Sequence, residues 1–222
     1  MSGVEVIRKI AEVGIVPVVR ARSSEEAASA IEAIREGGID VLEVTMTVPG
    51  AMRLIERLVE QYEERALIGA GTVLDAETAR ACILAGARFI VSPALDERTI
   101  EVCRRYGVVV MPGALTPTEI VRAWQAGADA VKVFPCSAMG GASYIRALKG
   151  PLPQIKLVPT GGVTLGNAAE HIRAGALALG VGTDLVDVKE LRAGRAHIIT
   201  ERARQFLDAV REARQEAPRA AR

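Results

Sequence analysis

The sequence predicts an α/β fold of the (β/α)8 TIM-barrel class with one extra helix at the N-terminus. Short β-branched runs alternate with amphipathic helical stretches along the whole chain. Glycines that close successive helices recur at intervals of 21, 20, 23 and 25 residues, from Gly86 through Gly107, Gly127 and Gly150 to Gly175. A repeat of this size, one strand plus one helix, indicates parallel strands with right-handed crossovers. Several runs, such as VVVMPG and LALGVG, are apolar throughout, as expected of strands covered on both faces.

The elements follow in order. A helix over 4–13 precedes the first strand and is expected to plug or flank the bottom of the barrel. The next helix begins at Ser23 or Ser24 and ends at Gly37 or Gly38. A last helix over 196–214 completes the ring, and residues from about 215 to 222 form a frayed tail. The eight predicted strands cover 15–20, 41–46, 66–73, 88–93, 108–113, 130–135, 156–161 and 177–182.

This organisation predicts a single domain over residues 1–222. A doubly wound open sheet is the alternative, but it usually has fewer strands and a Gly-rich first turn, where this chain reads VVRARSS.

Composition excludes several classes of function. The chain is 50% apolar and 25% charged, with a net charge of +1. This balance does not suggest a basic tract that binds nucleic acid or a polybasic surface that binds membranes. Aromatic residues make up only 3%, too few for a base-stacking platform. The N-terminus lacks the pattern of a signal peptide, and no apolar run is long enough to span a bilayer. Three scattered cysteines form no disulfide or zinc framework, so we expect a reducing cytoplasm.

Two charged residues lie inside apolar strands. In barrels of this class the active site is formed at the carboxyl ends of the strands. Lys132 lies in AVKVFP on the same face as Ala130 and Phe134, so it should point into the barrel mouth, while Glu43 lies in VLEVTM. A buried amine whose pKa falls can attack a carbonyl, which makes Lys132 a Schiff-base candidate and Glu43 its acid/base partner. A structural ion pair between the two is the alternative.

Two glycine-rich turns follow the last two predicted strands, where phosphate sites of this fold form. The turns are Thr160-Gly161-Gly162 and Gly180-Val181-Gly182-Thr183. Their backbone N–H groups can approach an anion, although such glycines also occur in simple turns. Arg20 ends the first strand and either adds a contact to that anion or is a solvated loop arginine.

The remaining candidates favour structural roles. Cys82 and Cys103 lie on amphipathic helices, and Cys136 has no histidine beside it that would make it a catalytic thiolate. The only two histidines, His171 and His197, lie away from the strand ends, so we expect no metal site.

From Ile15 to Asp184 the chain resembles the family of 2-keto-3-deoxy-6-phosphogluconate aldolases, with their 4-hydroxy-2-oxoglutarate and 6-phosphogalactonate variants. The resemblance rests on segments in the family's order and spacing: LEVTMTVPGA, IGAGTV, FIVSPALD, MPGALTPTE, VKVFP, ALKGPLPQIKLVPTGGV and GVGTDLV. It implies a homotrimeric class I aldolase without cofactor or metal that cleaves a keto-acid sugar phosphate reversibly to pyruvate and an aldehyde such as glyceraldehyde 3-phosphate.

The resemblance also implies roles for individual residues. Lys132 matches the Schiff-base lysine and Glu43 the general acid/base. The pyruvate pocket matches Thr72, Pro93 and Phe134. The contact to the aldehyde part matches Thr160. The phosphate-binding turns match Gly161, Gly162, Gly182 and Thr183.

The chain departs from part of the family at Thr47. Some phosphogluconate enzymes read EVTLRT, with an arginine near the pyruvate carboxylate, where this chain reads EVTMTVP. Recognition of that carboxylate would then rest on hydroxyls and backbone amides. Two other functions stay open on the sequence: a phosphosugar isomerase or synthase on the same barrel, which would need a second carboxylate or a cysteine acid/base pair, and a trimeric, non-catalytic or engineered assembly scaffold.

Overall fold

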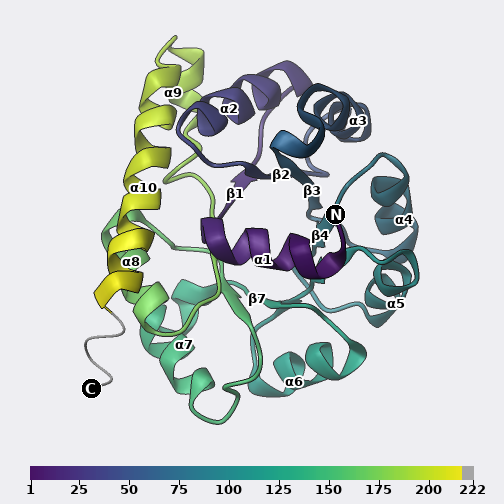
Figure 1. The fold of residues 1–222 in the computed structure, drawn as a ribbon, viewed down its shortest axis with the longest axis vertical. Helices are drawn as coiled ribbons and strands as arrows, with labels where there is room; N and C mark the ends of the chain where they lie inside the picture. The colour runs from purple at the N-terminus through teal and green to yellow at the C-terminus, as the bar shows by residue number, and fades with distance from the viewer. Residues whose placement is uncertain (217–222) are drawn as a thin grey trace.

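The computed structural model describes residues 1–216, in which helices surround a set of parallel strands (Figure 1). The strands are β1 (Ile15–Val19), β2 (Val41–Thr45), β3 (Leu67–Gly71), β4 (Phe89–Val91), β5 (Val109–Met111), β6 (Gly113–Ala114), β7 (Val131–Val133), β8 (Leu157–Pro159) and β9 (Leu179–Val181). The helices are α1 (Gly3–Val13), α2 (Ser24–Glu36), α3 (Ala51–Tyr62), α4 (Ala76–Leu84), α5 (Glu97–Tyr106), α6 (Pro117–Ala126), α7 (Ala142–Lys149), α8 (Leu165–Arg173), α9 (Val188–Arg192) and α10 (Ala196–Glu216), with 3-10 turns η1 (Glu63–Arg65) and η2 (Cys136–Met139).

The strands form two parallel sheets, one in the order β5-β4-β3-β2-β1-β9 and the other β6-β7-β8. The chain itself links the sheets at one side, because β5 and β6 are consecutive and separated only by Pro112. A bridge between Thr160 and Gly180 links them at the other side. The strand predicted over 108–113 is therefore interrupted at Pro112, which has no backbone N–H to give to a ladder.

Each face of the strands packs against a different partner. Residues such as Val131 and Val133 on β7 pack outward against helices α6 and α7. Residues that alternate with them, such as Ala130 and Val158, join a second cluster with Val6 and Ile10 of α1. We call this second face the inner face. The sequence prediction that Ala130 and Lys132 lie opposite Val131 and Val133 is confirmed.

Helix α1 lies across the centre of the ring in Figure 1. It contacts β1, β2 and β5 and packs on inner-face residues near the beginning of the strands, so it covers the end of the molecule opposite the carboxyl ends of the strands. Ser2 begins the helix with a reciprocal capping pair to Glu5, and Gly14 ends it in the left-handed region. The predicted N-terminal helix is thus present, one residue longer than expected.

The C-terminal helix α10 lies beside α8 and α2. It runs to Glu216, so Gln215 and Glu216, predicted as part of a frayed tail, are helical; the rest of that prediction, 217–222, falls outside the described residues. Of the two predicted caps for α2, Ser23 is the one whose side chain accepts a backbone N–H, from Glu26.

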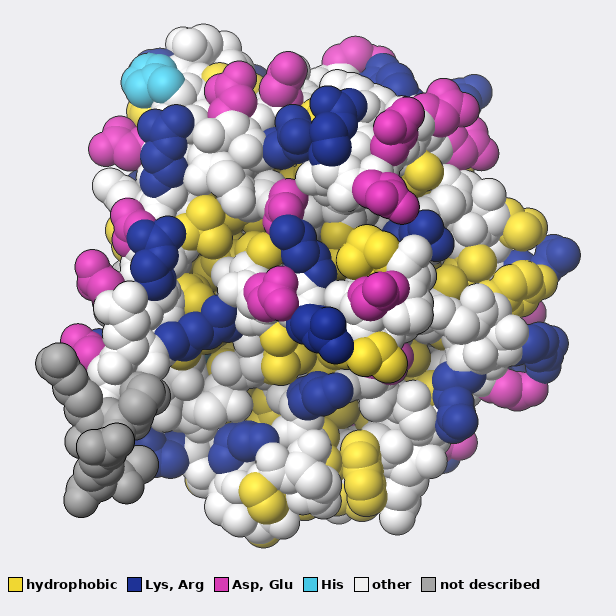
Figure 2. All heavy atoms as spheres, in the orientation of Figure 1, with side chains coloured by type: hydrophobic (Ala, Val, Ile, Leu, Met, Phe, Trp, Pro, Cys, Tyr) yellow, Lys and Arg dark blue, Asp and Glu magenta, His cyan; other side chains and the backbone are white. Residues whose placement is uncertain are grey.

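The face that carries α1 shows charged side chains of both signs (Figure 2). Basic and acidic side chains alternate over it, with apolar side chains visible between them (Figure 2). No helix within residues 1–216 combines the length and the apolar character needed to cross a membrane.

Candidate active site

Glu43 and Lys132 both lie on the inner face, in the middle of their strands. Glu43 of β2 pairs in register with Val18 and Gly69, and Lys132 of β7 pairs with Gly113 and Val158. Both are buried, with relative exposures of 1% and 3%. The two charged residues that the sequence singled out therefore reach the same interior.

Burial dominates the electrostatics of this pair. It raises the pKa of Glu43, against the opposing positive charges of Lys132 and Arg20. It lowers the pKa of the Lys132 ammonium, while the Glu43 carboxylate works in the other direction and the Arg20 guanidinium lowers that pKa further. Both shifts favour the neutral forms, and a neutral amine is the form that attacks a carbonyl.

The ion pair weighed from the sequence is not formed. The salt bridges of residues 1–216 do not include Glu43 with Lys132. Glu43 Oε1 is instead a buried oxygen without a hydrogen-bond partner among the described residues. Such an orphaned acceptor is costly in a structural role and marks a place where a proton or a ligand atom is expected.

Glycines on the inner face make room for Glu43 and its surroundings. A Cβ atom at Gly71 would lie 1.8 Å from Glu43 Oε1, and one at Gly180 would lie 2.1 Å from Thr160 Oγ1. Sequence reasoning missed Gly71 as part of the site. The sequence shows two glycines, Gly69 and Gly71, on the same face of a predicted strand, but the contact with Glu43 depends on the register between β2 and β3.

A cleft of about 630 Å³ opens at the carboxyl ends of β1, β7, β8 and β9. It is lined by predicted site residues from four segments of the chain, namely Arg20, Phe134, Thr160, Gly161, Gly162, Gly182 and Thr183. Phe134 connects this cleft to the buried amine, because Lys132 Nζ lies 5.2 Å from the centre of its ring. The cleft therefore leads from the surface toward Lys132.

The far end of the cleft has the character of an anion site. The backbone N–H groups of Gly161, Gly162 and Thr183 donate to no backbone acceptor among the described residues. Gly161 and Gly162 adopt left-handed φ angles of 86° and 75°, and a Cβ at Gly162 would lie 2.3 Å from Ser137 Cβ. Only glycine fits this turn without strain. With the exposed Arg20 on its wall, the turn combines free N–H donors and a positive charge.

Three charged residues of this end were missed from the sequence, Asp184, Asp187 and Arg202. Asp184 follows the second glycine turn directly, so its position was a usable signal. Arg202 comes from α10 and reaches the cleft only through helix packing, so no local pattern indicates it.

The three remaining predicted residues lie near strand ends but do not line this cleft. Thr47 is exposed, and its hydroxyl is 2.7 Å from that of Thr45, which donates to the carbonyl of Val19. Thr72 follows β3 with a left-handed φ of 57°, which is uncommon for threonine. Pro93 follows β4, and its backbone packs close to Gly113: a Cβ at Gly113 would lie 2.2 Å from the carbonyl group of Pro93. Their assignment to a pyruvate pocket stays a prediction.

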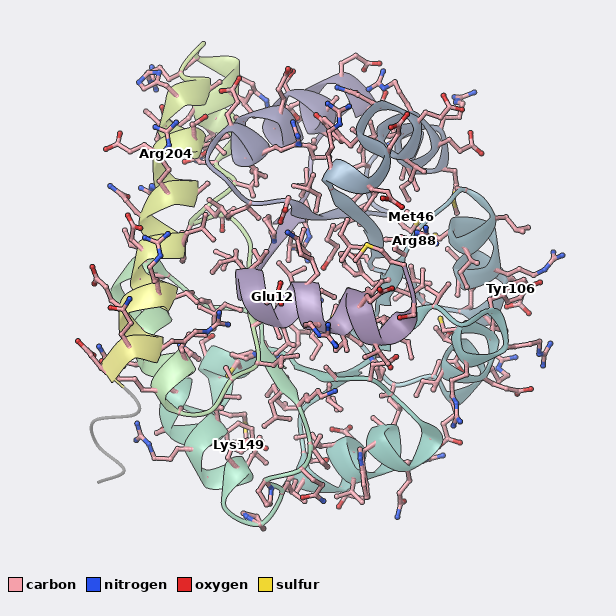
Figure 3. The ribbon with its side chains drawn as sticks, viewed as in Figure 1. Glu12, Met46, Arg88, Tyr106, Lys149 and Arg204 are labelled. Carbon is pink, nitrogen blue, oxygen red and sulfur yellow. The ribbon has the colours of Figure 1, made fainter. Side chains whose placement is uncertain are left out.

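The cysteines lie outside the site. Cys82, Cys103 and Cys136 are free and buried, and burial raises their thiol pKa values to about 12, 12 and 11. Cys82 packs with its sulfur 3.6 Å from that of Met46, which is labelled in Figure 3. Within residues 1–216 no group of three or more His, Cys, Asp or Glu side chains is arranged to hold a metal ion.

Comparison with known proteins shows which family the chain belongs to. The model of the aldolase family described as KDPG and KHG aldolase matches residues 6–202. The 2-dehydro-3-deoxy-6-phosphogalactonate aldolase of Escherichia coli strain K12 is 38% identical over 201 residues, which are 90% of this chain and 95% of that protein. The 2-dehydro-3-deoxy-phosphogluconate aldolase of Treponema pallidum is 33% identical over 207 residues, 93% of this chain and 98% of that protein.

Solved structures give the same result. A KDPG aldolase of Legionella pneumophila, with pyruvate captured as a covalent carbinolamine, superposes with a TM-score of 0.83 at 30% identity and covers 90% of this chain and 97% of its own. A structure titled native KDPGal has the same TM-score at 37% identity, covering 90% of this chain and 96% of its own. The family match and these relatives show that the chain belongs to the KDPG and KHG aldolase family, a family of aldehyde-lyases.

Proposed function

We propose that the protein is a class I aldolase that reversibly cleaves 2-keto-3-deoxy-6-phosphogluconate, or its phosphogalactonate or 4-hydroxy-2-oxoglutarate analogue, to pyruvate and an aldehyde through a Schiff base on Lys132. The observation that carries the proposal is a buried amine with a lowered pKa that lies 5.2 Å from the ring centre of Phe134, a residue of the cleft lining, on an inner face that also holds a buried, unpartnered carboxyl oxygen. The names of the relatives and the covalent pyruvate adduct of the Legionella enzyme support it.

The chemistry begins with the neutral amine. The Lys132 Nζ lone pair attacks the C2 carbonyl carbon, and the carbonyl oxygen takes up a proton to give a carbinolamine. Protonation of its hydroxyl by Glu43 lets water leave, which produces the iminium. The covalent iminium divides one difficult step into easier ones, because it withdraws electrons from the neighbouring bond.

Cleavage then uses the same carboxylate as a base. Glu43, through a water molecule, removes the proton of the C4 hydroxyl, the C3–C4 bond breaks, and its electron pair moves onto the iminium to form an enamine. The aldehyde leaves, Glu43 returns a proton to C3, and water hydrolyses the new iminium to release pyruvate and the free amine. The raised pKa of Glu43 suits a group that gives and takes protons in turn.

The substrate is proposed to extend from the cleft into the predicted pyruvate pocket, whose residues Thr47, Thr72 and Pro93 lie outside the cleft lining. Its keto-acid end would contact Phe134 and the predicted pocket residues Thr47, Thr72 and Pro93, with Thr160 beside the aldehyde part. Its phosphate would bind the turns at Gly161, Gly162, Gly182 and Thr183, with Arg20 on the adjacent wall. The unsatisfied N–H groups of these turns support that orientation.

The test is borohydride reduction in the presence of pyruvate, followed by peptide mass spectrometry. We expect a pyruvate adduct on Lys132, loss of cleavage in Lys132→Ala, and no change in the matched control Lys156→Ala, an exposed lysine before β8. An unmodified Lys132, or full activity in Lys132→Ala, would contradict the mechanism. Pyruvate release from the three candidate substrates identifies the preferred one.

We also propose that the two sheets close into a complete (β/α)8 barrel and that the protein is a cytoplasmic homotrimer. The Thr160–Gly180 bridge and the continuity of β5 and β6 support closure. Free cysteines fit a reducing compartment. A designed cage built by fusing symmetric oligomeric domains is 36% identical, with a TM-score of 0.85 over 94% of this chain and 76% of its own. Light scattering of the purified protein distinguishes a trimer from a monomer.

The synthase alternative has support only at the level of the fold. A 3-hexulose-6-phosphate synthase of Salmonella typhimurium superposes with a TM-score of 0.73 over 90% of this chain and 99% of its own, but at 16% identity. Such a likeness says nothing about chemistry.

A further inference from the structure

Two acidic residues, Asp184 and Asp187, line the end of the cleft that is built for an anion. The side chain of Asp187 accepts the backbone N–H of Lys189 at the beginning of α9. Asp184 lines the cleft next to Thr183, and its side chain is 30% exposed. A phosphate ester carries about −1.5 to −2 charges at neutral pH, so an uncompensated carboxylate beside it would weaken binding. The Asp184 carboxylate nevertheless has a structural role, because its Oδ2 accepts the backbone N–H of Leu165 at the beginning of α8, 2.8 Å away.

Arg202 provides the compensation from a different part of the chain. It extends from α10 into the same cleft, and its Nη1 lies 3.4 Å from Asp184 Oδ1. The same nitrogen donates to the backbone carbonyl oxygen of Asp184. One guanidinium thus faces the carboxylate and also holds the backbone of the residue that follows the glycine turn.

We propose that Arg202 is a positioning and specificity residue for phosphorylated substrates, acting by neutralising Asp184 at the phosphate end of the cleft. This inference rests on the proposed function. It predicts that the C-terminal helix decides how well the enzyme distinguishes a phosphorylated aldehyde from its neutral counterpart, although α10 contributes nothing to the Schiff-base chemistry.

The experiment compares two aldehydes in the condensation with pyruvate, D-glyceraldehyde 3-phosphate and neutral D-glyceraldehyde. In Arg202→Gln we expect kcat/KM for the phosphorylated aldehyde to fall about tenfold, through KM, while the value for the neutral aldehyde changes by less than about twofold. A tenfold change corresponds to about 1.4 kcal/mol. The matched control is Arg204→Gln, which removes the same charge from the exposed side of α10 (Figure 3).

A second variant tests the charge argument itself. Asp184→Asn keeps an oxygen that can accept the Leu165 N–H but removes the negative charge. Adding it to Arg202→Gln should recover most of the lost discrimination. If the double variant stays impaired, compensation of Asp184 is not the role of Arg202. Equal loss for both aldehydes, or no loss, would also overturn the proposal.

A readout without catalysis separates this inference from the proposed function. Inorganic phosphate should raise the melting temperature of the wild type and of Arg204→Gln. The rise should be much smaller in Arg202→Gln and should return toward the wild-type rise in the double variant with Asp184→Asn. If the wild type forms no pyruvate adduct, the proposed function fails, and the phosphate shift still decides the role of Arg202. Equal phosphate shifts in all four proteins would overturn it.

Discussion

Gly71 offers a direct way to test whether Glu43 works from the position that the structure gives it. Gly71→Ala adds a methyl group on the inner face, where the new Cβ would lie 1.8 Å from Glu43 Oε1, 2.4 Å from Cδ and 2.7 Å from Cγ. Gly71 is not in the left-handed region, so the backbone accepts alanine and the strain falls on the neighbouring side chain. The substitution therefore displaces Glu43 without changing it.

The size of the effect follows from the overlap. Normal contact distances between such atoms are about 3.5 Å, so the carboxyl must retreat by more than about 1 Å. A misplacement of that size costs on the order of 10²-fold in rate, and loss of a general acid/base costs about 10²- to 10⁴-fold. Overpacking should also lower the free energy of unfolding by about 1–3 kcal/mol. We expect proton transfer in Gly71→Ala to slow at least about 100-fold.

The assay follows exchange of the pyruvate methyl protons with deuterated water by NMR, because this exchange needs the enamine and its base but no aldehyde. Trapping of pyruvate on Lys132 by borohydride is measured in parallel. The adduct should still form, but more slowly, because Glu43 also protonates the hydroxyl that leaves the carbinolamine. Gly69→Ala is the control, because its Cβ would lie 2.4 Å from the Phe89 ring and overpacks the same strand away from Glu43. Adding Glu43→Asp to Gly71→Ala shortens the carboxylate and should restore part of the exchange.

Exchange at the wild-type rate in Gly71→Ala would refute the reasoning, since it would show that proton transfer does not depend on the carboxyl at this place. Equal slowing in Gly69→Ala would also refute it, because general loosening of the inner face would then explain both variants.

Three further outcomes are expected. Lys132→Met should raise the free energy of unfolding by about 1–2 kcal/mol in denaturant titration. The reason is that the pKa of Lys132 is lowered in the folded protein, so the lysine costs stability as pH falls from above 10.5 through the folded-state pKa, and methionine removes that cost. A lower free energy of unfolding in Lys132→Met would contradict this. The rate at which the borohydride-trapped adduct forms should rise with pH, with a midpoint below pH 10.5. Glu43→Gln should move that midpoint to lower pH, because it removes the negative charge that raises the pKa of Lys132. A midpoint shifted to higher pH would contradict this effect of Glu43. A thiol reagent at pH 8 should leave Cys82, Cys103 and Cys136 unmodified in the folded protein and label all three after unfolding, given their burial and raised pKa values; labelling of the folded protein would argue against it.

Sequence reasoning found the features that depend on local pattern. Strand positions and the inward direction of Lys132 follow from short apolar runs and a period of two, and the structure agrees on both. The interruption at Pro112 was missed, because a strand run was extended through a residue that lacks an N–H donor. The space that Gly71 leaves for Glu43 depends on register between two strands, and the contact of Arg202 with Asp184 depends on how α10 packs, so neither is visible in local sequence.

The unpaired arrangement of Glu43 and Lys132 is what amine chemistry requires. A close ion pair would hold Lys132 protonated and remove its lone pair. The ring of Phe134, 5.2 Å from Nζ, also favours the ammonium, but such a contact gives only about 0.5–2 kcal/mol. Removing an ammonium from water costs several kcal/mol, so desolvation outweighs the ring and the pKa of Lys132 falls. Within residues 1–216 the inner face thus buries a base and an acid without a salt bridge between them, which leaves the lone pair of Lys132 available.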